Sequence, residues 1–245
     1  MSVKSLVGSI LPPSAKARIF TFQAICDFAR TGGTVAKREC NVCGYKGQFY
    51  PFGLHLRRDA GCPNCRSFER HRLFKLFFDA NRQHFDGKDI LHFAPEKSLS
   101  QFVGLAAKSY TTADLFNENA DLRLDIEQIV MPNAFDTIIA SHVLEHVDDY
   151  KALRSIHDTL RPGGVLLAMV PIYEGTTTFE DNTITDKKER ELYFGQHDHL
   201  RCYGSDFVDR VESANFRVRR FYAEEKSIPR YNLMRGDCVF CCRRT

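Results

Sequence analysis

The sequence predicts an α/β protein in which helices cover both faces of a doubly wound, mostly parallel sheet. Phe135–Ala140 is a short apolar run, rich in β-branched residues and too brief for a helix, so it predicts a buried strand. Asp148–Leu160 has apolar side chains at helical spacing behind two aspartates that can cap the helix start. Arg161-Pro-Gly-Gly is expected to end that helix before a second apolar strand, Val165–Val170. Together, the strand, the crossover helix and the second strand make a parallel βαβ unit.

The rest of this α/β domain, residues 88–245, shows the same alternation of apolar runs and helical patterns. A helix that starts at Ser67 precedes the domain and is broken by Asp86-Gly87. The further strands are expected at Asp89–Ala94, Ser109–Ala113, Val218–Ala223 and Cys238–Cys242, and the further helices at Glu96–Ala107 and from Ser205 onward.

Two segments resemble a known family. The first is Phe-Asp-Thr-Ile-Ile-Ala-Ser-His-Val-Leu-Glu-His-Val at 135–147, and the second is Leu-Arg-Pro-Gly-Gly-Val-Leu at 160–166. In this order, separated only by the helical segment, they resemble the binding core of class I S-adenosylmethionine (SAM)-dependent methyltransferases of type 11. The resemblance covers roughly residues 88–223. It implies a Rossmann-like seven-stranded sheet, with the last two strands antiparallel at its edge, and SAM as the cofactor.

The length and composition fit a folded globular chain. It has 245 residues, of which 43% are apolar, enough for one α/β domain and a small additional module. No apolar run approaches the about 20 residues of a membrane span, so we expect no integral membrane association. Residues 1–34 are expected to be a helical or irregular leader that lacks the features of a signal peptide. These features favour a cytoplasmic location.

Four cysteines predict a structural zinc site in residues 35–87, a small zinc knuckle module with its connecting helix. They form Cys40-x-x-Cys43 and Cys62-x-x-Cys65, and each pair can present two thiolates from one turn. The alternatives are redox dithiols or unlinked cysteines. Four cysteine ligands would fill a tetrahedral site, so this spacing does not predict a catalytic zinc.

The resemblance also implies where SAM binds. Ligands of open parallel sheets bind outside the carboxyl ends of the strands. Asp114 is expected to hold the ribose hydroxyls, and Asp125 to accept from the adenine amino group while Ile126 packs against the ring. The full set of expected cofactor-binding residues is His92, Ala94, Pro95, Glu96, Asp114, Leu115, Asp125, Ile126, Ser141 and His142.

The first strand departs from the family pattern. The usual acidic residue and glycine-rich turn are replaced by His92-Phe-Ala94-Pro95-Glu96, and no glycine occurs from residue 88 to residue 103. Pro95 donates no backbone hydrogen bond, so the chain must approach the cofactor by another path. Glu96 either pairs with the SAM ammonium group or merely starts a helix. His92 either contributes a hydrogen bond or is packed in the sheet.

Methyl transfer to an oxygen or a protonated nitrogen needs a proton acceptor, for which histidine is suited near neutral pH. His142, Glu145 and His146 fall on one face of a helical turn, although His146 could instead be a hinge residue. In this family the insertion at residues 172–200 covers the acceptor. Its residues 197–199 are not expected to converge on one metal if extended. The candidate catalytic residues are His142, His146, His197 and His199, and the candidate substrate-binding residues are Arg201 and Tyr203.

Three functions are compatible with these motifs. The first is a SAM-dependent methyltransferase of a small molecule or of a glycan or lipid precursor. The second is a zinc-ribbon RNA methyltransferase, because residues 35–82 contain ten Lys/Arg and four Asp/Glu, a surplus of 10 − 4 = +6, although the whole chain is only +3. The third is a non-catalytic interaction protein, suggested by the altered first-strand turn.

Overall fold

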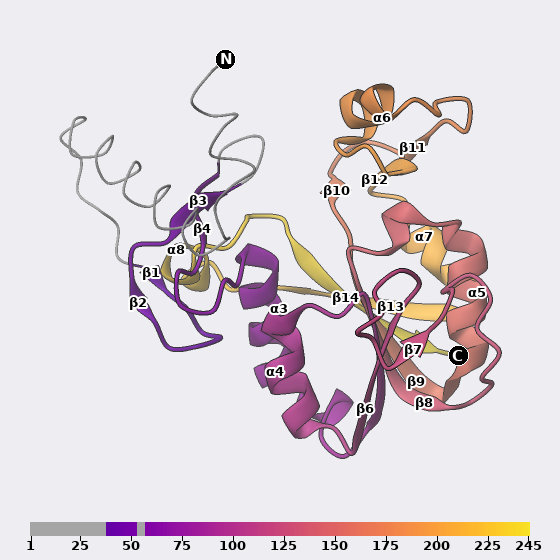
Figure 1. Ribbon diagram of the computed structural model, residues 1–245, viewed down its shortest axis with the longest axis horizontal. Helices are drawn as coiled ribbons and strands as arrows, with labels where there is room; N and C mark the ends of the chain where they lie inside the picture. The colour runs from indigo at the N-terminus through magenta and orange to yellow at the C-terminus, as the bar shows by residue number, and fades with distance from the viewer. Residues whose placement is uncertain (1–37, 53–56) are drawn as a thin grey trace. The chain divides into compact units, whose positions relative to one another are not determined.

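The computed structural model describes residues 38–52 and 57–245 (Figure 1). The leader expected at residues 1–34 lies outside the described residues. The chain divides into two compact units. One contains the described residues up to Leu76 and the segment Ala223–Arg235, and the other contains Phe77–Tyr222 and Gly236–Thr245. The segment Ala223–Arg235, which the sequence placed in the α/β domain, therefore packs with the cysteine module.

The cysteine unit contains two short antiparallel hairpins, β1 with β2 and β3 with β4. The guanidinium of Arg72, which is fully buried, joins its parts by donating to the carbonyl oxygens of Ser67, Ala60, Tyr231 and Asn232 at 2.6–3.0 Å. The elements are β1 (Arg38–Glu39), β2 (Lys46–Gly47), β3 (Tyr50–Phe52), β4 (Arg57–Gly61), α8 (Ser227–Tyr231) and the start of α3 (Glu69–Ala80).

The second unit is built on a seven-stranded sheet with the order β13-β14-β9-β8-β5-β6-β7. The five strands from β9 to β7 pair in parallel, and β14 is antiparallel to both of its neighbours, β9 and β13. The predicted doubly wound fold and the antiparallel edge pair are confirmed. The strands are β5 (Asp89–Phe93), β6 (Ser109–Asp114), β7 (Leu122–Arg123), β8 (Phe135–Ser141), β9 (Leu160–Met169), β13 (Phe216–Tyr222) and β14 (Cys238–Arg244).

The helices of this unit lie on both faces of the sheet, with α4 on one side and α5 and α7 on the other (Figure 1). Helix α5 begins where the two aspartates predict, since the Asp148 side chain accepts from the Lys151 backbone N–H at 3.2 Å. The helices that cover the sheet are α4 (Lys97–Ala106), α5 (Asp149–Thr159) and α7 (Phe207–Glu212), and the unit has short 3₁₀ turns η1 (Arg82–His84) and η2 (Leu144–His146).

The Arg161-Pro-Gly-Gly sequence does not lie between helix and strand, as expected, but inside the strand. Helix α5 ends at Thr159 and β9 already starts at Leu160, with a shift in its pairing to β8 after Phe135. A side chain at Gly164 would place its Cβ 2.9 Å from two backbone oxygens. The glycine therefore allows the strand to bend there without breaking.

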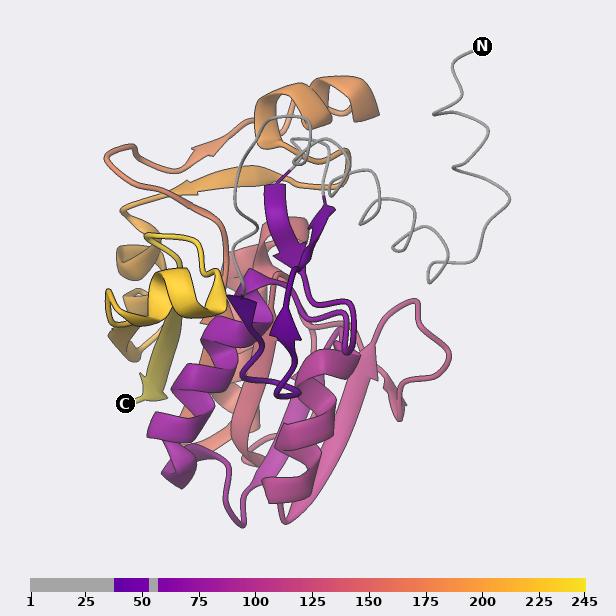
Figure 2. The same ribbon diagram turned by 90° about the vertical axis from the view of Figure 1, so that its left-hand side faces the viewer.

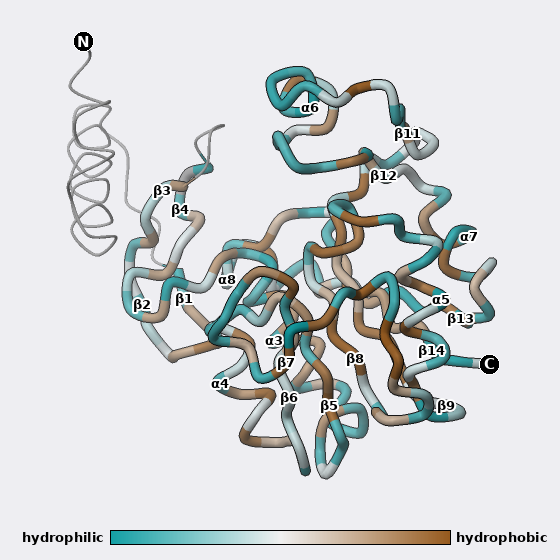
Figure 3. Tube along the Cα trace, turned by 45° about the vertical axis from the view of Figure 1, so that its right-hand side comes forward, coloured by the Kyte–Doolittle hydropathy of each residue, from teal (hydrophilic) through white to brown (hydrophobic). Residues whose placement is uncertain are grey.

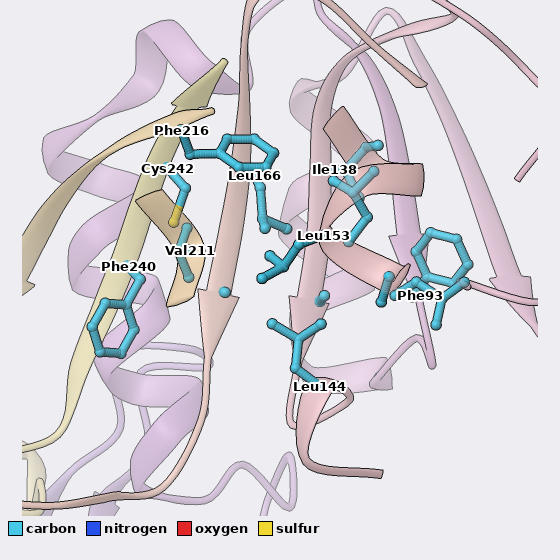
Figure 4. Packing of buried hydrophobic residues seen from close by; sticks show 14 of the residues in the cluster. Phe93, Ile138, Leu144, Leu153, Leu166, Val211, Phe216, Phe240 and Cys242 are labelled. Carbon is cyan, nitrogen blue, oxygen red and sulfur yellow. The ribbon is translucent and has the colours of Figure 1, made fainter. Parts of the chain in front are cut away.

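Apolar side chains from the sheet, α5 and α7 form one continuous core. Figure 4 shows Phe93, Leu144, Leu153, Leu166 and Phe240 within this layer. The central strands β8 and β9 are hydrophobic along most of their length, whereas α6 (Lys187–Phe194) is mainly hydrophilic (Figure 3). This pattern is the one expected of strands that are covered on both faces.

The insertion after β9 folds as a small layer of its own. It contains α6 and a three-stranded sheet with the order β10-β12-β11, and it gathers at one end of the unit (orange in Figures 1 and 2). Its strands are β10 (Ile172–Tyr173), β11 (Phe179–Glu180) and β12 (Arg201–Gly204). Among the described residues, no helix combines the length and apolar character that crossing a membrane requires.

Candidate active site

Strands β5, β6 and β8 reach the carboxyl edge of the sheet in register. Phe93 of β5 pairs with Ala113 of β6 and with Ala140 of β8. The order of the sheet reverses at β5, because β6 and β7 extend to one side and β8 and β9 to the other. Such a switch point is where open α/β sheets bind their ligands.

Two residues at this edge have a left-handed backbone. Ala94, directly after β5, has φ 46°, and His142, directly after β8, has φ 55°. The left-handed region costs a non-glycine residue roughly 1–2 kcal/mol. Ala94 thus adopts a backbone conformation that usually requires glycine. The chain turns through this residue although the glycine-rich turn of the family pattern is absent. Strain of this kind clusters at functional sites.

Asp114 ends β6 with one carboxylate oxygen already engaged. Its Oδ1 accepts the backbone N–H groups of Phe116 and Asn117, both at 2.8 Å. Its Oδ2 accepts no hydrogen bond from the described residues. The turn therefore fixes the half-buried carboxylate at the strand end and leaves one oxygen available.

Asp125 lies just beyond β7, the neighbour of β6. Its two oxygens accept from the Glu127 backbone N–H at 2.9 Å and from Gln128 Nε2 at 2.8 Å. Ile126 is 5% exposed and packs into the hydrophobic core. Both side chains lie at the expected edge but already have protein contacts.

The other expected cofactor residues differ in their burial. His92 is fully buried in β5, with Nδ1 2.6 Å from the Tyr110 hydroxyl oxygen. Pro95 and Glu96 are half-buried, and Glu96 occupies the N-cap of α4 without a side-chain capping hydrogen bond. Leu115 is exposed. His92 is therefore packed within the sheet, whereas residues 94–96 are exposed or half-buried at the strand end.

Ser141 provides a polar atom that needs a partner. Its side chain is buried at the carboxyl end of β8, and its Oγ has no hydrogen bond within the described part of the chain. A buried polar group without a partner costs about 1–3 kcal/mol. A bound molecule at this edge would remove that cost.

Three of the four histidines expected to act in catalysis lie close to one another, and the fourth lies apart. His142 Nδ1 lies 3.1 Å from Glu145 Oε1, and the rings of His146 and His199 are 4.6 Å apart, edge to face. His197 is exposed and lies outside this group. The structure therefore brings three of the four histidines together around Glu145, which was not among the predicted site residues.

Burial affects the chemistry of His199. Its Nδ1 is 3.0 Å from the Phe194 carbonyl oxygen, so this nitrogen carries the proton and donates it. Burial lowers the pKa of His199 below its usual value. The ring is therefore neutral near pH 7, with its Nε2 lone pair free.

Arg201 and Tyr203 lie in a buried network within the protein. Arg201 donates from Nη1 to the Leu144 and Val147 carbonyl oxygens at 3.0 and 2.6 Å and from Nε to a Glu180 carboxylate oxygen at 2.8 Å. The Tyr203 hydroxyl lies 2.9 Å from an oxygen of Asp149, and burial raises the pKa of Tyr203 well above its usual value. These side chains thus fasten the insertion to the η2 turn.

Asp149 is the centre of this network and was expected only as a helix-capping residue. It is fully buried and accepts from Arg210 Nε and Nη2 at 2.9 and 3.1 Å. Nothing in the local sequence indicates this role, because Arg210 comes from a distant helix. The one relevant sequence signal is that Arg210 lies at helical spacing from Phe207, an apolar residue of α7 that faces the core.

The four predicted metal ligands converge in the cysteine unit. Cys40 Sγ lies 3.6 Å from Cys65 Sγ, and Cys43 Sγ lies 3.7 Å from Cys62 Sγ. All four sulfur atoms lie within 4.8 Å of one another. Each sulfur contact joins one cysteine pair to the other.

The two cysteine turns have the same backbone design. In the first, Gly44 N–H donates to the Cys40 carbonyl oxygen at 2.7 Å, and Gly44 has φ 76°. In the second, Arg66 N–H donates to the Cys62 carbonyl oxygen at 2.8 Å, and Arg66 has φ 61°. The Ser67 hydroxyl adds contacts of 3.2 Å to the Cys40 and Cys65 sulfur atoms.

Solved structures with the same fold are methyltransferases. A SAM-dependent methyltransferase from Mesorhizobium loti is 16% identical with a TM-score of 0.50, over 68% of this chain and 97% of that one. A 1,6-didemethyltoxoflavin-N1-methyltransferase from Burkholderia thailandensis is 14% identical with a TM-score of 0.48, over 67% and 74%. A SAM-dependent methyltransferase from Archaeoglobus fulgidus is 12% identical with a TM-score of 0.48, over 71% and 94%. At 16% identity, the similarity to the first of these structures shows the fold alone.

No curated protein matches this chain. A family described as a methyltransferase domain matches residues 52–220, which is more than half of the chain and includes the whole carboxyl edge from β5 to β9. The fold, the switch point and this match agree, and the chain therefore belongs to the family of SAM-dependent methyltransferases.

Proposed function

We propose that this protein transfers the methyl group of SAM to an oxygen or nitrogen of a small molecule or of a glycan or lipid precursor. The observation that carries the proposal is the carboxyl edge of the sheet. There, Asp114 Oδ2 and Ser141 Oγ both lack partners among the described residues, and both flank the switch point. These groups fit a ligand that is rich in hydroxyl and amino groups.

SAM would be held by groups with complementary chemistry. Asp114 Oδ2 would accept from the ribose hydroxyls, and Ser141 Oγ would pair with a polar group of the ligand. Glu96, a half-buried carboxylate directly after the turn that follows β5, would pair with the ammonium group. The left-handed Ala94 would bring the backbone close to the ligand without a glycine. When bound, SAM supplies an electrophilic methyl group.

His142 is the residue we assign as proton acceptor. Glu145 Oε1 holds its Nδ1 at 3.1 Å, so Nε2 is the nitrogen that accepts a proton from the methyl acceptor. The side chain of His142 is 32% exposed, which leaves it accessible, whereas the carboxylate that orients it is buried. A fixed, accessible base at the strand end is the arrangement that general base catalysis requires.

Arg201 and Tyr203 are assigned a positioning role instead of direct substrate binding. The Arg201 contacts to Leu144, Val147 and Glu180 occupy its guanidinium, and Tyr203 is buried. Both would keep η2, and with it Glu145, at the correct place beside the strand end.

The cysteine unit is proposed to hold a structural zinc ion. A Zn–S bond of about 2.3 Å in a tetrahedral site gives a separation between sulfur atoms of about 3.8 Å. The two sulfur contacts of 3.6 and 3.7 Å are close to that separation. The site needs reduced thiols, which supports a reducing compartment such as the cytoplasm.

The contacts of the cysteine unit argue against RNA as the acceptor. Arg72 is buried, Arg38 pairs with Asp59 at 3.3 Å, and Arg57 lies 3.4 Å from Glu69. The two ion pairs occupy Arg38 and Arg57 but leave the net surplus of residues 35–82 unchanged, because their carboxylates are already counted in it, whereas the charge of Arg72 is withdrawn from solvent. A small acceptor fits these observations better than a phosphate backbone does.

The proposal is tested by measuring SAM and S-adenosylhomocysteine binding calorimetrically to the wild type, Asp114→Asn and the control Glu118→Gln. Glu118 is exposed in the same loop. Loss of a charged acceptor is expected to cost about 1.5–3 kcal/mol, or roughly ten- to a hundredfold in affinity, for Asp114→Asn alone. Equal affinity of both variants would exclude the assigned ribose contact. Failure of the wild type to bind either ligand would instead favour a non-catalytic protein.

A further inference from the structure

A second cluster of metal-binding side chains lies beside the carboxyl end of β8. Glu145 and His146 belong to η2, and His199 belongs to the insertion just before β12. One potential ligand atom from each of the three lies within 4.8 Å of the others. The Leu200 N–H donates to the Glu145 carbonyl oxygen at 2.9 Å, so the backbone itself holds the two segments together at this point.

Each of the three side chains is oriented by a second partner. His199 Nδ1 donates to the Phe194 carbonyl oxygen at 3.0 Å, and His146 Nδ1 lies 3.4 Å from Asp198 Oδ2. Glu145 Oε1 receives His142 Nδ1 at 3.1 Å. Histidines that bind metals almost always donate their other ring N–H to a carboxylate or a backbone carbonyl. Here this arrangement leaves the Nε2 atoms of both histidines and Oε2 of Glu145 for a ligand.

Two of these atoms are buried without a partner. Glu145 is 1% exposed and its Oε2 makes no hydrogen bond, and His199 is 5% exposed and its Nε2 makes none, within the described residues. A buried carboxylate oxygen and a buried imidazole nitrogen are each costly to leave unpaired. A cation between them would satisfy both atoms at once, whereas a water molecule would leave the carboxylate charge uncompensated.

We propose that Glu145, His146 and His199 bind a divalent transition-metal ion of the Zn²⁺ class. Two imidazoles and one carboxylate favour Zn²⁺, Fe²⁺, Co²⁺ or Ni²⁺ over Mg²⁺ or Ca²⁺, which prefer oxygen ligands. Three protein ligands leave at least one coordination position open, unlike the four cysteines. The side chain of His146 is 29% exposed, which gives solvent access to the site.

The ion would join the insertion to the sheet edge at the position of the proposed proton acceptor. Its ligands come from both segments, and His142 contacts the same carboxylate from the other side. The open coordination position would take water or an oxygen atom of the methyl acceptor. The metal site itself does not depend on SAM binding and can be tested without it.

The experiment measures metal binding to the full chain, first saturated with one equivalent of Zn²⁺ to fill the cysteine site. Isothermal titration with further Zn²⁺ is expected to show one additional equivalent. Loss of a supporting partner alone weakens metal sites about 10–100-fold, so His199→Gln and Glu145→Gln should weaken the second equivalent at least tenfold. His197→Gln, on the same loop but exposed and outside the cluster, should not change it.

Equal loss in the His197→Gln variant, or a wild type that binds only one equivalent, would overturn the proposal. X-ray absorption on the wild type loaded with one Zn²⁺ and one Co²⁺ keeps the test decisive if a variant fails to fold. The Co²⁺ edge should show nitrogen and oxygen neighbours at about 2.0–2.2 Å, and sulfur neighbours near about 2.3 Å would instead place cobalt among the cysteines.

Discussion

The cysteine cluster and the Glu145–His146–His199 cluster gather metal-binding side chains by opposite means. Each cysteine pair sits on a turn closed by its own backbone hydrogen bond, from Gly44 to Cys40 in one case and from Arg66 to Cys62 in the other. The second cluster instead joins two segments that are far apart in the sequence. Its members come from η2 and from the insertion, and long-range contacts bring them together.

The difference determines what a sequence can reveal. A turn of fixed length gives a fixed spacing, so Cys-x-x-Cys is recognisable before any fold is known. His199 meets Glu145 through long-range contacts, namely the Leu200 backbone hydrogen bond to Glu145 and the Arg201 and Tyr203 hydrogen bonds to Leu144. We expect the cysteine unit to unfold when its metal is removed. The Glu145–His146–His199 cluster should instead lose metal affinity when its supporting network is broken.

The largest expected effect is in the cysteine unit. Cys40→Ser should abolish stoichiometric zinc binding and unfold this unit, because structural zinc contributes about 10–16 kcal/mol of binding free energy and its ligands Cys40 and Cys62 themselves form a buried cluster with Phe49. Metal analysis and limited proteolysis would measure both changes. Cys202→Ser, at a half-buried thiol outside the site, is the control. Zinc retention and protease resistance in Cys40→Ser would show that this unit folds without metal.

The next largest effect is expected in the network beneath the second cluster. Asp149→Asn removes the charge that Arg210 and Tyr203 contact, and breaking a buried ion pair costs about 3–5 kcal/mol. The variant should lower the free energy of unfolding of the α/β unit by that amount and weaken binding of the second metal equivalent, with the cysteine zinc retained. Denaturant unfolding followed by circular dichroism measures the first effect.

Asp158→Asn serves as the matched control, because Asp158 is an exposed carboxylate on the same helix. It should change the free energy of unfolding by less than about 1 kcal/mol. If Asp149→Asn changed the free energy of unfolding as little as this control, the network would not support η2. The proposed difference between the two clusters, one formed by local turns and one by long-range contacts, would then be wrong.

The sequence predicted the parts of the fold that depend on local pattern. The β8 and β9 runs, the cap of α5 and the antiparallel edge strands are confirmed. It did not predict that Arg161-Pro-Gly-Gly lies inside β9, because proline and glycine read as breaks while the bulge that accommodates them depends on pairing with β8. The Pro-Gly-Gly signal depends on neighbouring residues alone, whereas the pairing of β9 with β8 joins residues that are distant in the sequence.

Prediction of the candidate active site from the sequence had the same limit, because local pattern does not give long-range contacts. Asp114 and Ser141 lie at the carboxyl edge because strand ends follow from strand positions. Arg201 was expected to meet a substrate, since an arginine near histidines suggests anion binding. Its burial against Glu180 and two backbone carbonyls arises from the way the insertion folds back, which no spacing in the sequence encodes.

The smallest expected effect tests the unusual turn at the sheet edge. Ala94 has φ 46°, a conformation that costs a residue with a side chain roughly 1–2 kcal/mol and glycine almost nothing. Ala94→Gly removes that strain but adds about 0.4–1 kcal/mol of chain entropy to the unfolded state. The balance predicts a gain in the free energy of unfolding of up to about 1 kcal/mol.

Ala106→Gly, in the last turn of α4, provides a control of opposite sign. Ala106 is helical, so glycine there should destabilise the unit by about 1 kcal/mol. Denaturant unfolding of the two variants separates the cases, because the substitution is the same and only the backbone conformation differs. A loss of stability in Ala94→Gly equal to that of Ala106→Gly would mean that residue 94 is not left-handed in solution. The chain would then have to turn at the cofactor edge through a different residue, and the glycine-like path assigned to Ala94 would be withdrawn.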